Sequence, residues 1–305
     1  VGVQIQQADI IGDLSQAYIF DTVADYQTST IVFPVGKTIH LNDRQADFAI
    51  IAGTGTANTF NIIASDEVSQ SIDLIVGDAA YIDQFGAQEY PFDSTGAIQE
   101  AHATGKSVHY DQSKEYLITS NIYPMSNTTI YGSRIKVETW ADGTGNDPVL
   151  RRGVYNYAGV ENVNTLDLII TDDYNDTGDL AITAFMIQGC NNLLFRKCQG
   201  THTIARTRTY APFDIEGGNT NIWVDKSYFK NETGELGGCW IRAVSGNTSG
   251  VSITNCEFDK DAGDEVLAVF GVLNKTSDVL IKGNKFNSKS GTTQGTYISF
   301  FPLSA

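Results

Sequence analysis

The stretch from Phe185 to Phe286 repeats with a period close to 28 residues. Its apolar residues come in pairs that a single residue separates. These pairs are Leu193/Phe195, Ile222/Val224, Val251/Ile253 and Val279/Ile281, spaced 29, 29 and 28 residues apart. Apolar residues at alternate positions predict short strands with one buried face. A unit of this length cannot bury that face by itself, so the units must stack on one another.

A second apolar series precedes the first in each unit. Its pairs are Phe185/Ile187, Phe213/Ile215, Ile241/Ala243 and Val269/Gly271, each 28 residues after the one before. Two or three short strands per turn, with polar corners between them, predict a solenoid whose strands pair in parallel with the next coil. Each coil then rises by about 4.8 Å. We expect Phe229, Phe258 and Phe286 to form one internal column.

Asparagines follow the second series at a nearly constant distance. Asn191, Asn219 and Asn247 each stand six residues after the start of a pair. Stacked asparagines bond through their side-chain amides from one strand to the next. The spacing therefore predicts an asparagine ladder at one corner of the solenoid.

Several of these units resemble the coils of a known fold. The segments NTNIWVDKSYFKN, TSGVSITNCEFDKD and TSDVLIKGNKFNS are similar to coils of the right-handed parallel β-helix of pectate-lyase-like proteins. The resemblance covers roughly residues 160–300. It implies an all-β chain with a right-handed parallel β-helix over residues 129–305.

The segment before the coils predicts a small β domain over residues 1–80. Its expected strands are Ile31–Val35, Thr38–Leu41, Asp47–Ile51, Phe60–Ala64 and Ile72–Val76, with glycines marking turns between them. Residues 81–128 predict a cap and entry segment. Asp93 or Ser94 can begin a short helix there, and Ala97, Ile98 and Ala101 give it an apolar face.

The cap segment also carries a resemblance. Phe85-Gly86-Ala87, Asp93-Ser94-Thr95 and Ala97-Ile98-Gln99 look like the opening of the β-helix in bacteriophage tailspikes and related polysaccharide-acting enzymes. The preceding small domain resembles the one that precedes the cap in tailspikes. The resemblance implies a helix that covers the open first coil, a homotrimer, and attachment to other virion tail proteins through the N-terminal region.

Charge and composition exclude several classes of partner. The net charge is −16, and residues 1–100 hold 14 acids against 2 bases. A nucleic acid is therefore not expected as a partner. No run of 18 apolar residues occurs, so no membrane span is expected. The four cysteines lack a CxxC spacing, and Cys198 and Cys256 lie two coils apart, too far for a disulfide. We expect buried, unreactive thiols.

Two carboxylates are the candidate catalytic pair. With Phe213 and Ile215 inside, Asp214 and Glu216 are expected to point outward, about 6.6 Å apart at Cα. Glycoside hydrolysis uses such a pair as acid and base or nucleophile. The predicted register places Arg242 beside Asp214. The alternative is a cross-strand ion pair between these two residues, with Glu216 a solvated surface acid.

Other residues are candidates for holding a sugar. His202, Arg206 and Tyr210 occupy a long corner, GTHTIARTRTYAP, and would suit an acidic sugar. Trp223 and Trp240 could each stack on a sugar ring. The alternative for Trp223 is a trimer interface, since it shares an outward stripe with Leu194, Ser252 and Leu280.

No metal site or cofactor is expected. Asp172, Asp173, Asp176 and Asp179 cluster in one loop, as calcium ligands do, but Tyr174 and Asn175 interrupt them and acidic turns are common. The four histidines make no spaced metal set.

The resemblance implies a tailspike-like receptor-binding protein, located in a phage virion or otherwise extracellular, that recognises a bacterial surface polysaccharide. Whether it also depolymerises that polysaccharide, as a hydrolase or a lyase, stays open. A non-catalytic structural or adhesive virion trimer is one alternative. A secreted polysaccharide lyase or hydrolase is another.

Overall fold

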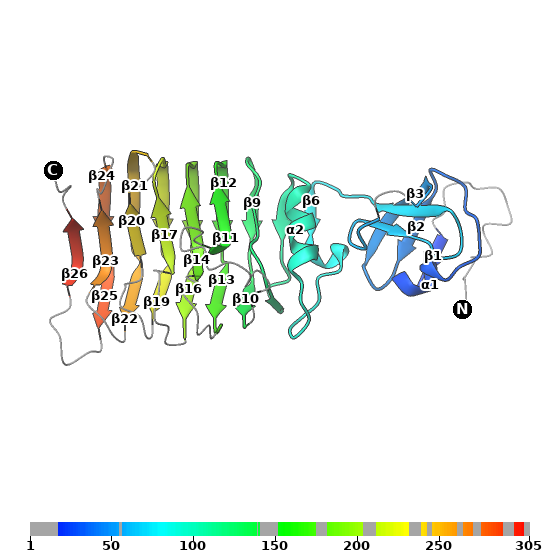
Figure 1. The fold of residues 1–305 in the computed structure, drawn as a ribbon, viewed down its shortest axis with the longest axis horizontal. Coiled ribbons are helices and arrows are strands. Elements are labelled where there is room, and N and C mark those ends of the chain that lie inside the picture. The colour runs from blue at the N-terminus through cyan, green and yellow to red at the C-terminus, as the bar shows by residue number, and fades with distance from the viewer. Residues whose placement is uncertain are drawn as a thin grey trace.

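The computed structural model shows an elongated molecule with strands stacked along its long axis (Figure 1). It describes residues 18–54, 57–138, 140, 152–174, 182–203, 212–231, 239–242, 246–260, 265–270, 276–288 and 296–301. The N-terminal sheet lies at one end, helix α2 lies between it and the stacked coils, and the coils extend to the C-terminus. The expected all-β fold with a parallel β-helix is confirmed.

Three parallel sheets form the walls of the β-helix, and every pairing within them joins one coil to the next. Sheet 1 consists of β6 Ala79–Tyr81, β7 Ser107–His109, β9 Thr129–Tyr131, β12 Glu161–Leu166, β15 Asn191–Arg196, β18 Thr220–Asp225, β21 Thr248–Thr254 and β24 Thr276–Lys282. Sheet 2 consists of β8 Glu115–Leu117, β10 Arg134–Val137, β13 Ile169–Asp172, β16 Gln199–His202, β19 Tyr228–Asn231, β22 Glu257–Lys260 and β25 Lys285–Ser288. Sheet 3 consists of β11 Arg152–Ala158, β14 Ile182–Gln188, β17 Phe213–Glu216, β20 Cys239–Arg242, β23 Glu265–Phe270 and β26 Thr296–Phe301. The chain passes through the sheets in the order 1, 2, 3 in each regular coil.

The internal phenylalanine column is confirmed. Phe229 pairs with Phe258, and Phe258 with Phe286. Their rings stack with centroids 5.6 and 5.4 Å apart. Phe229 and Phe258 are fully buried. Each ring therefore covers the faces of its neighbours, which is how units that cannot bury themselves form a continuous core.

The register of sheet 1 follows the predicted intervals, and that of sheet 3 departs from them at one of its predicted pairings. Leu193, Ile222, Val251 and Val279 lie in one row, as predicted. In sheet 3, Phe213 pairs with Cys239 and Ile215 with Ile241. The predicted alignment of Phe213 with Ile241 is therefore wrong by two residues. A two-residue shift keeps the same residues on the inner face, because side chains alternate with a period of two.

Left-handed residues make the corners of the β-helix. One corner holds the column Asp167, Lys197, Lys226, Asn255 and Gly283, with φ between 51° and 69°. Another holds the column Asn127, Asn162, Asn192, Asn221, Gly250 and Asp278, with φ between 55° and 67°. Asparagine and glycine tolerate this conformation better than other residues. The chain thus turns at the same place in every coil, which keeps the strands in register.

An asparagine ladder exists, but at different residues from those predicted. Each side-chain amide of the ladder donates a hydrogen bond to the asparagine of the coil before. The distances are 2.9 Å from Asn162 to Asn127, 3.1 Å from Asn192 to Asn162, and 3.2 Å from Asn221 to Asn192. Asn191 pairs with Thr220 instead of Asn219. The predicted stack of Asn191, Asn219 and Asn247 is therefore wrong.

Asn219 has a different role, inside the tube. It is buried, it accepts a hydrogen bond from the Cys190 amide, and it donates to the Glu216 and Ile187 carbonyls. In the same way, Ser227 accepts a hydrogen bond from the Cys198 amide, and Asn284 accepts one from the Cys256 amide. These side chains satisfy backbone groups that the corners leave unpaired.

The four cysteines are buried and unpaired, as predicted. Burial raises the pKa of the Cys198 thiol to about 12 and that of the Cys256 thiol to about 11. Because the thiolate is the reactive form, these thiols are inert at neutral pH.

The N-terminal sheet has the strand order β1-β2-β3-β5-β4. Its strands are β1 Tyr18–Phe20, β2 Thr38–Leu41, β3 Ala46–Ala52, β4 Ile62–Ala64 and β5 Gln70–Leu74, and the short helix α1 spans Val23–Gln27. The predicted strand Ile31–Val35 is wrong. There the Gln70 side chain bonds both the amide and the carbonyl of Phe33, in place of a partner strand.

The predicted cap helix is confirmed as α2, Thr95–Ala103, and the 3-10 helix η2, Ile82–Phe85, precedes it. Ala97, Ile98 and Ala101 are buried, as predicted. Asp93 accepts hydrogen bonds from the backbone and the hydroxyl of Thr95 at the start of the helix. In the described part of the chain, no helix is both long and apolar enough to cross a membrane.

The cap helix buries a histidine. His102 packs edge-on against Tyr155, with ring centroids 5.8 Å apart, and neither ring nitrogen has a hydrogen-bond partner among the described residues. Burial lowers the pKa of His102 from 6.5 to about 3. The ring is therefore neutral in the folded protein near pH 7.

We expect truncation of the phenylalanine column to be costly. Phe258→Ala should lower the free energy of unfolding by about 3–5 kcal/mol, because it removes a buried ring and leaves a cavity between two coils. Phe92→Ala is the matched control, since Phe92 is 61% exposed, and it should change the free energy by less than about 1 kcal/mol. Denaturant unfolding measures both. Equal effects of the two substitutions would contradict the buried column.

We also expect acid to destabilise the protein through His102. Its folded pKa lies below that of the unfolded chain, so the unfolded chain binds a proton that the folded chain excludes. The free energy of unfolding therefore begins to fall as the pH drops below 6.5, and it keeps falling until about pH 3. At pH 5 the loss of stability amounts to about 2 kcal/mol. His102→Leu should reduce the difference in unfolding free energy between pH 7.5 and 5.0 by this amount. An unchanged difference would show that another group carries the pH dependence.

Candidate functional site

The outer face of sheet 1 carries a groove of about 640 Å³. Strands β12, β15, β18 and β21 contribute its lining, which is Asn162, Asn164, Asn192, Leu194, Arg196, Trp223, Asp225 and Thr254. Four adjacent strands fix these side chains at the spacing of the coils. The groove is therefore a preformed surface on a rigid support, as binding sites usually are.

Trp223 is the exposed aromatic residue of the groove. Ile222 and Val224 on either side of it are buried, so the alternation of the strand turns the indole outward, where it is 42% exposed. Leu194 and Ser252 are its neighbours in the adjacent coils. The side chain of Ser252 is too short to cover an indole. Trp223 thus offers an aromatic surface to a ligand.

Polar groups in fixed positions surround the indole. The amides of Asn162 and Asn192 belong to the asparagine ladder, which orients them. The Nε atom of Arg196 lies 3.4 Å from an Asp225 carboxylate oxygen. An exposed ring beside amides and paired charges is an arrangement that can bind a sugar, with the ring against its apolar face and the polar groups on its hydroxyls.

Asp225 is held ionised by its neighbours. Burial opposes ionisation, but hydrogen bonds from Asn255 and Thr254, at 3.1 and 3.0 Å, together lower the pKa of Asp225. The nearby charges of Lys226 and Arg196 act in the same direction. Asp225 therefore acts as a fixed anion that positions Arg196 at one end of the groove.

Asp214 and Glu216 are not on the surface. Asp214 is fully buried and Glu216 is 8% exposed. The expectation that both point into solvent is therefore wrong, because the outer face of sheet 3 is covered at these positions, as it also is at Met186 in the coil before. Both residues take part in further interactions. Their catalytic role stays a prediction.

The predicted partner of Asp214 is also wrong. Arg242 pairs with Glu216, and Trp240 pairs with Asp214. This is the two-residue shift of sheet 3 described above. The structure describes Arg242 and Trp240 by their backbone only, so their predicted contacts with a sugar stay predictions.

His202 lies inside the protein instead of at a binding surface. It is 2% exposed, and its Nδ1 atom lies 2.7 Å from a carboxylate oxygen of Asp172, which is also buried. Its position fits a role in holding two coils together better than the predicted contact with a sugar. Arg206 and Tyr210, predicted for the same corner, lie outside the described residues.

The acidic loop gives no metal site within the described part of the chain, where no group of three or more potential metal ligands occurs. Asp176 and Asp179 lie outside that part. Asp172 forms a hydrogen bond with His202. A carboxylate oxygen of Asp173 lies 3.7 Å from the Lys136 ammonium group, and Asp173 also accepts a hydrogen bond from the Thr203 hydroxyl.

A half-buried carboxylate cluster lies at the carboxyl ends of strands β10 and β13 in sheet 2. Lys136 contacts Glu138 at 2.6 Å and Asp173 at 3.7 Å, and Tyr90 donates to Glu138. The hydrogen bond from Lys136 is the largest influence on Glu138 and lowers its pKa. A general acid needs a raised pKa instead. The cluster is thus suited to join the cap to the first coils.

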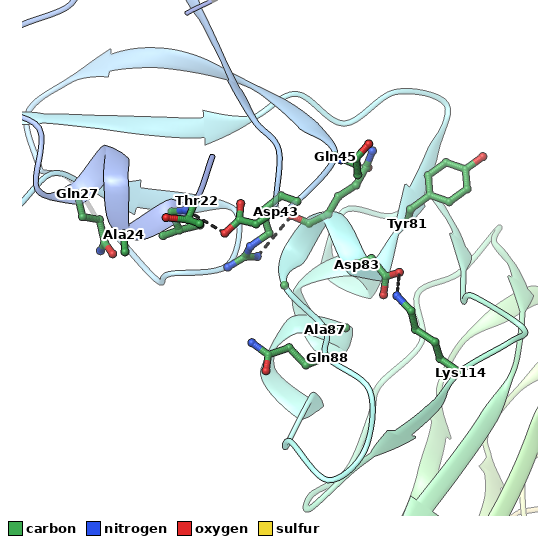
Figure 2. Close-up of a pocket in the computed structure, with 14 residues that line it drawn as sticks. Thr22, Ala24, Gln27, Asp43, Gln45, Tyr81, Asp83, Ala87, Gln88 and Lys114 are labelled. Atoms are coloured by element: carbon green, nitrogen blue, oxygen red, sulfur yellow. Dashed lines mark hydrogen bonds and ion pairs between the residues drawn. The ribbon is translucent and has the colours of Figure 1, made fainter. Parts of the chain in front are cut away.

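A cleft of about 900 Å³ separates the N-terminal sheet from the cap (Figure 2). Arg44 crosses it and donates to the carbonyls of Gln84 and Thr59, at 3.5 and 3.3 Å. Gly86 lies against the Arg44 guanidinium and has φ +91°, a backbone conformation that residues with a side chain rarely adopt. Lys114 pairs with Asp83 at 2.6 Å on the cap side. The hydrogen bond from Arg44 to the Gln84 carbonyl connects the two parts of the chain.

The residues that the sequence did not single out are Arg196, Asp225 and the ladder asparagines. Their signal was present, because Arg196 and Asp225 stand two positions after Leu194 and Trp223 on the same outward face.

Comparisons with known proteins give structural similarities only. No protein-family model and no curated protein matches the chain. Solved structures similar to it include Pantoea stewartii WceF, a glycan biofilm-modifying enzyme with a tailspike-like parallel β-helix fold. The identity is 14% and the TM-score 0.40, over 96% of this chain and 53% of that one.

Two more similar structures are the tailspike of Acinetobacter baumannii phage AM24 and PfbA, a surface adhesin of Streptococcus pneumoniae. The identities are 11% and 16%, and the TM-scores 0.45 and 0.41. The matches cover 92% and 71% of this chain, and 58% and 65% of those chains. The chain thus spans little more than half the length of most of these proteins.

Substitutions at the buried carboxylates test the predicted catalytic pair. We expect Asp214→Asn with Glu216→Gln to lower the free energy of unfolding by about 1–3 kcal/mol, because buried polar groups lose partners. Polysaccharide binding should be unchanged, since neither side chain reaches the groove. Denaturant unfolding and a binding assay measure the two effects. A variant of full stability that loses polysaccharide cleavage would instead support the catalytic role.

Proposed function

We propose that the chain is a tailspike-like receptor-binding protein whose groove at Trp223 binds a bacterial surface polysaccharide. The observation that carries the proposal is an exposed indole, set among ladder amides and a positioned arginine, on strands that cannot shift relative to one another. Ligand-binding pockets commonly combine an aromatic side chain with a few polar groups in fixed positions. The choice of a bacterial polysaccharide rests on the sequence resemblance to tailspikes.

The groove suits binding better than cleavage. Its carboxylate, Asp225, has a lowered pKa, accepts hydrogen bonds from Asn255 and Thr254 and forms an ion pair with Arg196, so it is a poor proton donor. Within the described residues, Asp225 is the only carboxylate that lines the groove. We therefore place recognition at the groove, and depolymerase activity, if the protein has it, at another site.

Further parts of the proposal follow from the sequence resemblance alone. They are a homotrimer, a place in a virion or otherwise outside the cell, and attachment to tail proteins through the N-terminal region. Residues 1–80, 81–128 and 129–305 are proposed as attachment domain, cap and β-helix. Strands β6, β7 and β8 of the first two segments already pair with the walls of the β-helix, so the cap and the first coils form one structure.

A second candidate function is self-association through the same face. Leu280 is 51% exposed and lies in the same row as Leu194, Trp223 and Ser252. The exposed apolar side chains of Trp223 and Leu280 in this row also fit a contact between subunits.

Trp223→Ala tests the proposal. We expect it to weaken binding to capsular polysaccharide or lipopolysaccharide preparations at least tenfold, about 1.4 kcal/mol, because it removes the central aromatic contact. Biolayer interferometry against an immobilised panel measures this. Tyr123→Ala is the matched control, since Tyr123 is exposed but lies outside the groove.

Light scattering on the same variants separates the two candidate functions. Weaker polysaccharide binding with an unchanged molecular mass supports the proposal. A lower molecular mass for Trp223→Ala, with no change in polysaccharide binding, contradicts it and identifies the face as a subunit contact.

A further inference from the structure

The groove lies beside a basic corner, although the chain is strongly acidic. The net charge of the chain is −16. The edge of sheet 1 that borders the groove carries four basic and two acidic residues. The basic residues are Arg196, Lys197, Lys226 and Lys282, and the acidic residues are Asp167 and Asp225. This corner is thus net positive by two charges, opposite in sign to the protein as a whole.

Arg196 presents an open edge of its guanidinium. It is 50% exposed, and Asp225 contacts it at Nε, 3.4 Å away. The two terminal nitrogens lie on the other edge of the fork, where they can donate in parallel to a carboxylate or a phosphate. Asp225 fixes the orientation of this fork through its own bonds to Thr254 and Asn255.

Two of the lysines stand where the backbone does not favour lysine. Lys197 and Lys226 have φ of 55° and 51°, in the left-handed region. The same corner of other coils holds Asp167, Asn255 and Gly283, and Asn, Asp and Gly are the residues that adopt this conformation most readily. A strained position occupied by a charged residue in two successive coils points to a use for the charge.

These lysines are also weakly engaged. Lys197 is 63% exposed, and its Nζ atom is 4.0 Å from Asp167. Lys226 is exposed as well. Lys282 continues the row of Arg196, Asp225 and Thr254 into the next coil. Positive charge therefore extends along the groove over several coils.

We infer that the ligand of the groove is an anionic glycan, whose sugar ring lies on Trp223 and whose carboxylate or phosphate group binds Arg196 with support from Lys226. The inference rests on the proposed function of the groove and specifies the class of its ligand. A neutral glycan would gain nothing from this charge, and a nucleic acid would be repelled by the acidic remainder of the chain.

The test uses four probes on the full chain. They are a capsular polysaccharide that contains hexuronic acid, the same polysaccharide with its carboxylates reduced to alcohols, a polysaccharide with phosphodiester groups, and neutral dextran. We expect the hexuronate or the phosphodiester probe to bind at least tenfold more tightly than the reduced probe and dextran. The preferred probe shows which anion the groove takes.

Charge variants complete the test. Arg196→Gln and Lys226→Gln should each weaken binding of the anionic probe at least threefold. Lys106→Gln is the matched control, an exposed lysine on the cap that should change nothing. Raising NaCl from 50 to 500 mM should weaken binding severalfold, because salt screens exposed charges. Circular dichroism shows that the variants stay folded.

Two outcomes would overturn the inference, and they are distinguishable. If the reduced probe binds as tightly as its parent and binding still depends on Trp223, the groove takes neutral sugars and the proposed function stands. If no probe binds in a manner that depends on Trp223, the proposed function fails and the inference fails with it.

Discussion

The structure depends on burial shared between coils. Each inward side chain of a regular coil lies between its counterparts in the coils before and after, as in the column of Phe229, Phe258 and Phe286. No coil has a core of its own, so its stability is a sum of contacts with its two neighbours. The parallel ladders of the three sheets add backbone hydrogen bonds at each of these contacts. Together they make a regular tube with three parallel sheets as its walls.

The corners transmit this regularity to the surface. Left-handed residues turn the chain at the same position in successive coils, and the ladder from Asn127 to Asn221 ties those positions together. Inside, Asn219, Ser227 and Asn284 accept from backbone amides that the turns would otherwise leave unpaired. The outer side chains next to the corners are therefore fixed as well. This is why a shallow groove on one wall can be a preformed binding site.

Polar groups inside the tube show the limits of the repeat. His202 and Asp172 pair in the interior, and His102 is buried in the cap as a neutral ring. Asp214 lies on the outer side of its strand and is nevertheless buried. The burial of His102 makes the stability of the protein depend on pH. The burial of Asp214 shows that the outer side of a wall is not the same thing as the surface of the protein.

The sequence determined the period, the inner residues and the class of fold. Alternation with a period of two assigns Ile222 and Val224 inward and Trp223 outward, whatever the neighbouring coil does. It also predicted the cap helix and the buried cysteines. It could not fix the register of sheet 3, because a shift of two residues keeps the same inner face, and so Arg242 lies beside Glu216 and not beside Asp214.

Tertiary structure alone decided which outward residues meet solvent. Asp214 and Trp223 both point away from the tube axis, yet one is fully buried and the other is 42% exposed. The same holds for the groove, which needs Arg196, Asp225 and Trp223 from adjacent coils in one place. Alternation is a local property of one strand. The cover over a strand and the neighbours across coils depend on segments far away in the sequence, and only the folded chain brings these together.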